Sequence, residues 1–407
     1  MKPLFRITHP LFKYLAVLAV VMAAAVVFYQ PAQGRSTTST GTTLKTPPAG
    51  QPRIQLAILL DTSNSMDGLI DQARNQLWQV VNEFASSKKN GMTPALQVAV
   101  YEYGNSRLSA ANGYVRQVTG LTGNLDRVSE ALFSLTTNGG DEYCGYVIDR
   151  AVRDLQWDDS PDDVKVIFIA GNEPFTQGPV SYQSAIALAK AKGITVNTIH
   201  AGDYNQGISS GWQAGALLAG GNYMSIDHNR KIVHVAAPQD DRLATLNREL
   251  NKTYIPYGAK GTEGSRRQQA VDDKNRKVSP ALMAERVQSK ASALYNSSDW
   301  DLVDAVKNGK AALGSLRPEA LPAEMQNMNE QEKKDYVKAK SEERSKIKKE
   351  IEELSVERDA FVAKAKQQAA PQPATVDTAM SAAIKKQMVE KDFELNNKHG
   401  GTEDTEK

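Results

Sequence analysis

The segment RIQLAILLDTSNS, residues 53–65, decides the fold. Its first part is a short apolar run that ends at Asp61, and its second part is polar. From Ile70 to Phe84 apolar residues recur at helical spacing on one face. A buried strand that leads through a polar loop into an amphipathic helix is typical of an α/β sheet.

Further strands and helices alternate after this first unit. Several of the strands are apolar nearly throughout, which is typical of a parallel sheet covered by helices on both faces. Ligands of such sheets bind at the carboxyl ends of the strands, so the polar residues after Leu60, Phe133 and Ala170 are expected at one rim. The strands expected after residue 84 are 96–103, 165–170, 194–200 and 223–226, and the helices are 125–133, 146–155, 181–192 and 212–218.

The polar loop after the first strand has the spacing of a cation site. Asp61, Ser63 and Ser65 fit the pattern D-x-S-x-S. A carboxylate and two hydroxyls at alternate positions of a tight loop point their oxygens at one spot. Hard divalent cations such as Mg²⁺ prefer oxygen ligands and retain waters. Two neutral serine ligands leave the ion electrophilic, so it is able to accept an acidic group from a partner.

The string LAILLDTSNSM resembles the metal-ion-dependent adhesion site loop of the von Willebrand factor type A (VWA) family. The Gly-Gly loop at Gly139, the strand KVIFIAGNEP and the strand ITVNTIHAG follow in the family's order, and the resemblance covers residues 53–229. It implies a VWA/Rossmann-like, mostly parallel sheet with helices on both faces. It also implies a binding protein rather than an enzyme, which uses a divalent cation, by preference Mg²⁺, to recognise an acidic group of a protein or ligand.

Two loops depart from the family pattern. The family's second loop supplies a Thr after the Gly pair, where this sequence has Asp141 and then Glu142. The third loop, usually Thr-Asp-Gly, here reads Ala170, Gly171 and Asn172, so the expected Asp is missing. Either acid of the second loop is a replacement for the lost carboxylate, and Asn172 offers an amide oxygen. The predicted metal ligands are Asp61, Ser63, Ser65 and Asp141.

The composition excludes several function classes. The chain has 407 residues, 41% of them hydrophobic, and a net charge of +2, which gives no overall field for nucleic acid. A single cysteine, Cys144, excludes an internal disulfide framework and a cysteine-cluster metal site. The sequence GISSG, residues 207–211, matches G-x-S-x-G but does not follow a strand directly, so it does not predict a nucleophile elbow.

The N-terminal residues predict export from the cytoplasm. Lys2, Arg6 and Lys13 precede an uncharged stretch, residues 14–33, with an apolar centre. We expect residues 1–34 to be a signal peptide, with a cleavage site at Ala32-Gln33-Gly34, or an inner-membrane anchor. Residues 35–52 are rich in Ser, Thr, Gly and Pro and are expected to form a flexible linker. A periplasmic location follows from either alternative.

The C-terminal part is expected to be helical. We divide the chain after the linker into a VWA-like domain (53–240), a helical extension (241–328), a long charged helix (329–368) and a disordered tail (369–407). The long helix is either solvated and laid on the domain or a coiled coil that makes a homo-oligomer. One heptad position holds Val337, Arg344, Ile351 and Arg358, and the other holds Lys340, Ile347, Leu354 and Phe361.

Two other functions stay open at the level of sequence. In one, the C-terminal helices build a structural scaffold of an envelope assembly and the VWA-like domain is a platform. In the other, the same metal serves a hydrolase, for which Glu142 or Glu173 is the candidate general base.

Overall fold

The computed structural model describes residues 50–85, 87–230, 234–368 and 376–395. The chain divides into two compact units, residues 1–46 and 47–407. The predicted signal or anchor and nearly all of the predicted linker lie outside the described residues. Within the described ranges, no helix combines the length and apolar content needed to cross a membrane.

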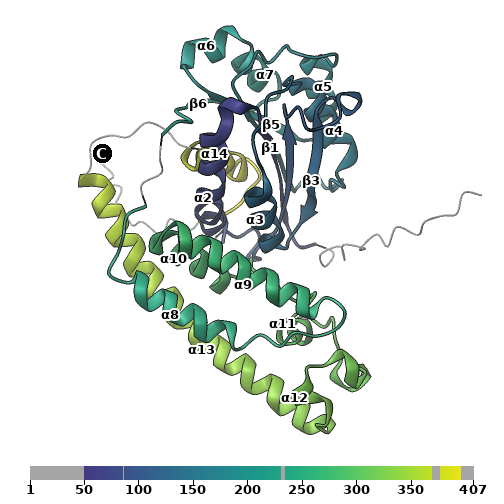
Figure 1. Ribbon diagram of the computed structural model, residues 1–407, viewed down its shortest axis with the longest axis vertical. Coiled ribbons are helices and arrows are strands. Elements are labelled where there is room, and N and C mark those ends of the chain that lie inside the picture. The colour runs from purple at the N-terminus through teal and green to yellow at the C-terminus, as the bar shows by residue number, and fades with distance from the viewer. Residues whose placement is uncertain (1–49, 86, 231–233, 369–375, 396–407) are drawn as a thin grey trace, which may run out of the picture. The chain divides into compact units, whose positions relative to one another are not determined.

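A six-stranded sheet forms the centre of the second unit (Figure 1). The strand order is β3-β2-β1-β4-β5-β6, and every pairing is parallel except β2 with β3. The expected mostly parallel α/β sheet is therefore confirmed. The strands are β1 (Arg53–Asp61), β2 (Ala95–Tyr103), β3 (Val115–Thr122), β4 (Val164–Gly171), β5 (Thr195–Ala201) and β6 (Tyr223–Ile226).

Strand β3 is absent from the sequence-based prediction. It is the edge strand of the sheet and pairs antiparallel with β2 through an irregular register. Most of its residues are half-buried or exposed, so its sequence VRQVTGLT lacks the apolar run of the buried strands.

Helices cover both faces of the sheet because β1 alternates its side chains between them. Leu56, Ile58 and Leu60 pack into one core with α2 and α3. Ala57 and Leu59 pack into the other core with α4, α5 and α7. These helices are α2 (Asp67–Phe84), α3 (Leu125–Ser134), α4 (Cys144–Asp154), α5 (Tyr182–Ala191) and α7 (Trp212–Leu218), with the short α6 (Tyr204–Ser209) between β5 and α7.

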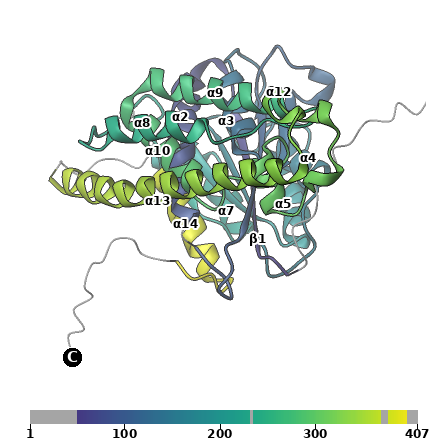
Figure 2. The same ribbon diagram turned by 90° about the horizontal axis from the view of Figure 1, so that it is seen from below.

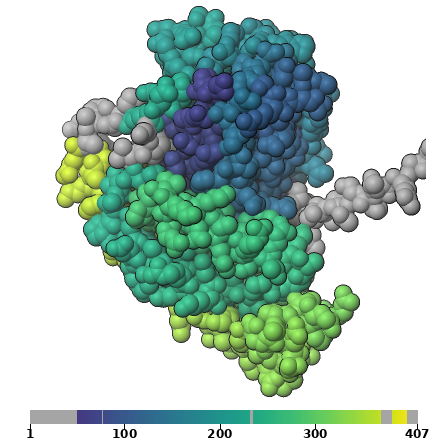
Figure 3. Space-filling view, viewed as in Figure 1, coloured from purple at the N-terminus to yellow at the C-terminus, as the bar shows by residue number. Residues whose placement is uncertain are grey.

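The helical extension continues the first of these two cores. Leu246, Leu282, Val287 and Ile351 belong to the same buried cluster as Leu56 of the sheet, and the surfaces of the two parts meet in Figure 3. Between residues 280 and 313 the extension forms two longer helical segments, separated by a stretch from 292 to 298 that contains Ser and Asn. The helices are α8 (Asp240–Asn251), α9 (Gly261–Val278), α10 (Pro280–Ala291), α11 (Leu302–Lys307), α12 (Ala323–Gln326) and α13 (Glu330–Gln368).

Buried ion pairs join the extension to the sheet domain. Arg286 of α10 lies 2.6 Å from a carboxylate oxygen of Asp126 in α3 and 3.1 Å from one of Asp272 in α9. Lys290, one turn further along α10, lies 3.0 Å from the second oxygen of Asp272. The Arg286 guanidinium also stacks on the Trp78 ring of α2, with its Cζ atom 4.4 Å from the ring centroid. Each charge in this cluster is therefore compensated without water.

Helix α13 lies against other helices of the same chain (Figure 2), in contact with α8, α10 and α11. Val337 and Ile351 are buried, and Arg344 and Arg358 of the same heptad position reach inward to carboxylates. Arg344 pairs with Asp301 at 2.7 Å, and Arg358 pairs with Asp240, also at 2.7 Å. This seam is thus filled within the chain, and a homo-oligomeric coiled coil stays a prediction that would need another face of the helix.

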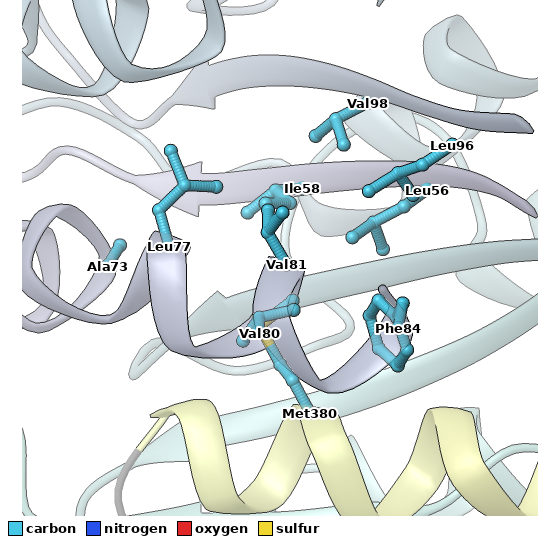
Figure 4. Close-up of a pocket in the computed structure, with 10 residues that line it drawn as sticks. All are labelled: Leu56, Ile58, Ala73, Leu77, Val80, Val81, Phe84, Leu96, Val98 and Met380. Atoms are coloured by element: carbon cyan, nitrogen blue, oxygen red, sulfur yellow. The ribbon is translucent and has the colours of Figure 1, made fainter. Parts of the chain in front are cut away.

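The predicted disordered tail contains a helix, α14 (Val376–Val389), which corrects that expectation. Met380, Ile384 and Met388 recur every four residues and pack against α2 and the face of β4 and β5. Met380 also borders an apolar cavity of about 20 Å³ between α2, β1 and β2 (Figure 4). The tail begins with an Ala/Pro-rich segment, which suggested disorder, and the apolar residues spaced four apart lie further along the sequence.

Candidate functional site

The carboxyl end of β1 brings three of the predicted ligands together. Asp61 is the last residue of the strand, and Ser63 and Ser65 follow in the turn before α2. The Oδ1 atom of Asp61 accepts a hydrogen bond from the Ser63 N–H at 2.8 Å. The hydroxyl oxygens of Ser63 and Ser65 lie 3.4 Å apart. The D-x-S-x-S loop therefore places the two serine hydroxyls next to each other, directly after Asp61.

One oxygen of Asp61 has no hydrogen-bond partner. The side chain is fully buried, and its Oδ2 atom has no donor among the described residues. Burial raises the pKa of Asp61 from 3.8 to about 7, although Ser63 and the Asn172 backbone partly offset the shift. A buried carboxylate with one unbonded oxygen and no positive partner is costly unless a cation compensates it. The orphaned oxygen and the two hydroxyls thus fit a hard divalent cation.

The second loop places Glu142, rather than Asp141, beside Asp61. Asp141 is exposed, and its Oδ2 atom accepts a hydrogen bond from the Tyr143 hydroxyl at 3.1 Å. Glu142 is only 6% exposed. Burial, followed by the charges of Asp61 and Glu173, raises the pKa of Glu142 to about 8. The structure therefore does not bring Asp141 to the other predicted ligands.

Two glycines let these side chains approach one another. A Cβ atom on Gly104 would lie 2.8 Å from both the Asp61 Oδ1 and the Glu142 Cγ atoms, and Gly104 also has a φ of +78°. A Cβ atom on Gly171 would lie 2.4 Å from the Tyr103 hydroxyl and 3.0 Å from the Asp61 Oδ2 atom. Backbone without side chains thus frames the carboxylates, a requirement that the sequence-based analysis did not identify.

The third loop contributes an amide. The Asn172 Nδ2 atom donates to the Ser65 hydroxyl at 3.4 Å, and its Oδ1 atom is buried with no partner among the described residues. The Asn172 carbonyl oxygen lies 3.3 Å from the Nε2 atom of His200, a residue near the carboxyl end of β5. Glu173, the next residue, is half-buried. Asn172 therefore lies where the sequence-based alternative put it.

Other candidate sites find no support in the described part of the chain. No group of three or more His, Cys, Asp and Glu side chains there is arranged to hold a metal. Ser209, in the G-x-S-x-G string, lies at the end of α6, and its hydroxyl donates to the Gln206 carbonyl. Thr137 bonds to Asp67 at 2.5 Å and not to the Asp61 loop.

Comparison with known proteins addresses the family. The model of the von Willebrand factor type A domain matches residues 55–208. No curated protein sequence gave a match. Among solved structures, the chain is similar to proximal thread matrix protein 1 from the mussel byssus with a zinc-occupied MIDAS motif (14% identity, 44% of this chain and 43% of that chain, TM-score 0.33).

Two further structures cover a similar part of the chain. They are the SpRpn10 VWA domain (16% identity, 43% of this chain and 88% of that chain, TM-score 0.31) and BatB from Bacteroides thetaiotaomicron (17% identity, 43% and 90%, TM-score 0.33). The match spans less than half of the mussel protein's length. The family model and the strand order agree, and residues 55–208 are the part of the chain identified as a von Willebrand factor type A domain.

Proposed function

We propose that this chain is an extracytoplasmic binding protein and not an enzyme. In this proposal Asp61, Ser63 and Ser65 hold a divalent cation, by preference Mg²⁺, and the cation binds an acidic group of a protein or ligand. The observation that carries the proposal is the Oδ2 atom of Asp61, which is buried without a donor beside two serine hydroxyls.

Each residue of the loop has a distinct part in binding. Asp61 supplies negative charge from the end of a rigid strand, and its Oδ1 atom is fixed by the Ser63 N–H. The serine hydroxyls add oxygen atoms without adding charge. A bound divalent cation supplies the positive charge and the open coordination position that attract an acidic partner. Ser65 is exposed, so the open side faces solvent.

The location in the proposal derives from the sequence before the described residues. Lys2, Arg6 and Lys13 followed by the apolar stretch 14–33 support export or anchoring in the inner membrane. The VWA domain then lies in the periplasm, where exported proteins are available as partners.

Calorimetric titration of the full chain with Mg²⁺ tests the cation step. Wild type is expected to bind one ion, and Asp61→Ala is expected to lose it because the only buried charge of the loop is removed. Thermal denaturation should show the same difference, since an ion that binds the folded state raises its stability. Equal titration curves for both proteins would refute the role of the loop.

Capture from periplasmic extract tests the partner step. The wild-type chain is expected to retain a partner in Mg²⁺ and to release it in EDTA, whereas Asp61→Ala retains nothing in either buffer. Equal amounts of retained partner with and without EDTA, and with wild type and Asp61→Ala, would contradict cation-mediated recognition.

A further inference from the structure

We infer that Glu142 is the second carboxylate ligand of the cation, so that the site consists of Asp61 and Glu142 with the Ser63 and Ser65 hydroxyls. This inference rests on the proposed function, because it concerns the same site. It assigns the charge lost from the third loop to a residue of the second loop, and it excludes the neighbouring Asp141.

The side chains of Asp61 and Glu142 approach one point from two different loops. A Cβ atom on Gly104 would lie 2.8 Å from the Asp61 Oδ1 atom and 2.8 Å from the Glu142 Cγ atom, which carries the carboxyl group. Only a glycine leaves room for them at that point. Two buried carboxylates that share a small space repel one another unless a proton or a cation lies between them.

Every other buried acid of the described residues has a donor or a positive partner within the chain. Glu102 pairs with Arg116, Asp126 with Arg286, Asp240 with Arg358, Asp272 with Lys290 and Asp301 with Arg344. Asp163 accepts a hydrogen bond from the Arg53 N–H.

Asp61 and Glu142 differ from this group. No Arg, Lys or His forms an ion pair with either of them within the described ranges, and the two lie side by side. The chain thus compensates its other buried acids with its own donors and leaves two adjacent acids uncompensated. The missing positive charge is what a divalent cation supplies.

Glu142 and Asp141 differ in burial and in hydrogen bonding. The Asp141 carboxylate is exposed and is engaged by the Tyr143 hydroxyl. Glu142 is 6% exposed and lies two residues before Cys144, the first residue of α4. Successive residues of an extended segment point to opposite sides, so only one acid of the pair faces Asp61.

The assignment also describes how the site meets its partner. Two carboxylates equal the charge of a divalent cation, so the ion is retained before any partner arrives. Serine hydroxyls and water fill the remaining positions, and the partner exchanges with a water on the solvent side. A chelator then removes both the ion and the partner.

The test compares Glu142→Gln with Asp141→Asn as a matched control in the full chain. Both substitutions remove one negative charge from the same loop. Mg²⁺ and Mn²⁺ affinities are measured by calorimetry, and thermal midpoints are measured in EDTA. We expect Glu142→Gln to weaken Mg²⁺ binding about tenfold or more, the range for groups that act on a bound metal. Asp141→Asn should stay within about twofold of wild type, as an exposed charge screened by solvent does.

The midpoint in EDTA distinguishes a ligand from a structural residue. Glu142→Gln should hold or raise the midpoint, because it removes a buried repulsion, while it weakens cation binding. A lowered midpoint together with unchanged Mg²⁺ affinity would overturn the assignment, and so would equal weakening by both variants. Absence of cation binding by wild type would instead refute the proposed function itself.

Discussion

Replacing Asp61 by Asn should remove the pH dependence that this buried acid imposes on the stability of the metal-free protein. The amide keeps an acceptor for the Ser63 N–H, the hydrogen bond that the Asp61 Oδ1 atom accepts at 2.8 Å. It removes the charge that has no donor at Oδ2. The perturbation is therefore almost purely electrostatic.

The sign follows from the raised pKa of Asp61. Its pKa is 3.8 in the unfolded chain and about 7 in the folded protein. Between these values the unfolded chain loses a proton that the folded protein keeps, so stability falls as the pH rises. Above pH 7 the cost is constant. At about 1.4 kcal/mol per pKa unit, the full cost is about 4 kcal/mol, of which about 2–3 kcal/mol develops between pH 5 and pH 8.

Urea denaturation of both full-length proteins in EDTA measures this difference. The advantage of Asp61→Asn over wild type should grow by about 2–3 kcal/mol from pH 5 to pH 8. Titrating groups that do not interact with Asp61 cancel in the comparison, and carrying out both measurements in a Glu142→Gln background removes the carboxyl whose pKa Asp61 raises. Saturating Mg²⁺ should stabilise wild type and leave the variant unchanged. An advantage that is constant to within about 0.5 kcal/mol, the usual effect of a neutral substitution, would refute the reasoning.

Three further substitutions test the framework around the site. Gly171→Ala places a methyl group 2.4 Å from the Tyr103 hydroxyl and should cost about 1–3 kcal/mol by overpacking, measured by urea denaturation, with weaker Mg²⁺ binding by calorimetry. Arg286→Met leaves the buried Asp126 without its ion pair and Asp272 with Lys290 alone, so it should cost about 3–5 kcal/mol, and a thermal midpoint equal to wild type would contradict this. Ile384→Ala on α14 should cost about 2–5 kcal/mol, whereas Val389→Ala on its 59% exposed side should change the free energy of unfolding by less than about 0.5 kcal/mol. Equal effects of the last two would show that α14 does not pack on the domain.

The central sheet was predictable because its strands carry their signal locally. The apolar run before Asp61 needs burial on both faces, and the polar turn after it marks the rim. Edge strand β3 and helix α14 were not predictable in the same way. The first is half-solvated, and the second obtains its stability from α2 and the sheet, more than 150 residues away in sequence.

The residues of the candidate site also differ in how far local sequence predicts their positions. Asp61, Ser63 and Ser65 lie within five residues, so their convergence depends on one turn and could be predicted from spacing. The choice between Asp141 and Glu142 depends on which of two adjacent side chains turns inward. That direction is set by contacts with Gly104 and Tyr143, which no local pattern contains.

The boundary of the family match does not coincide with the boundary of the packed core. Trp78, within the matched residues 55–208, donates its indole N–H to Asn275 of α9 at 2.7 Å and stacks on Arg286 of α10. Helix α14 covers the face of β4 and β5 from the other end of the chain. A fragment cut near residue 208 or 240 would expose this apolar face and leave Asp126 without its Arg286 partner. Since α2 begins directly after Ser65 and the 3₁₀ turn, loss of its packing partners would loosen the metal loop as well. Cation binding therefore has to be measured on the chain that contains the helical extension and α14.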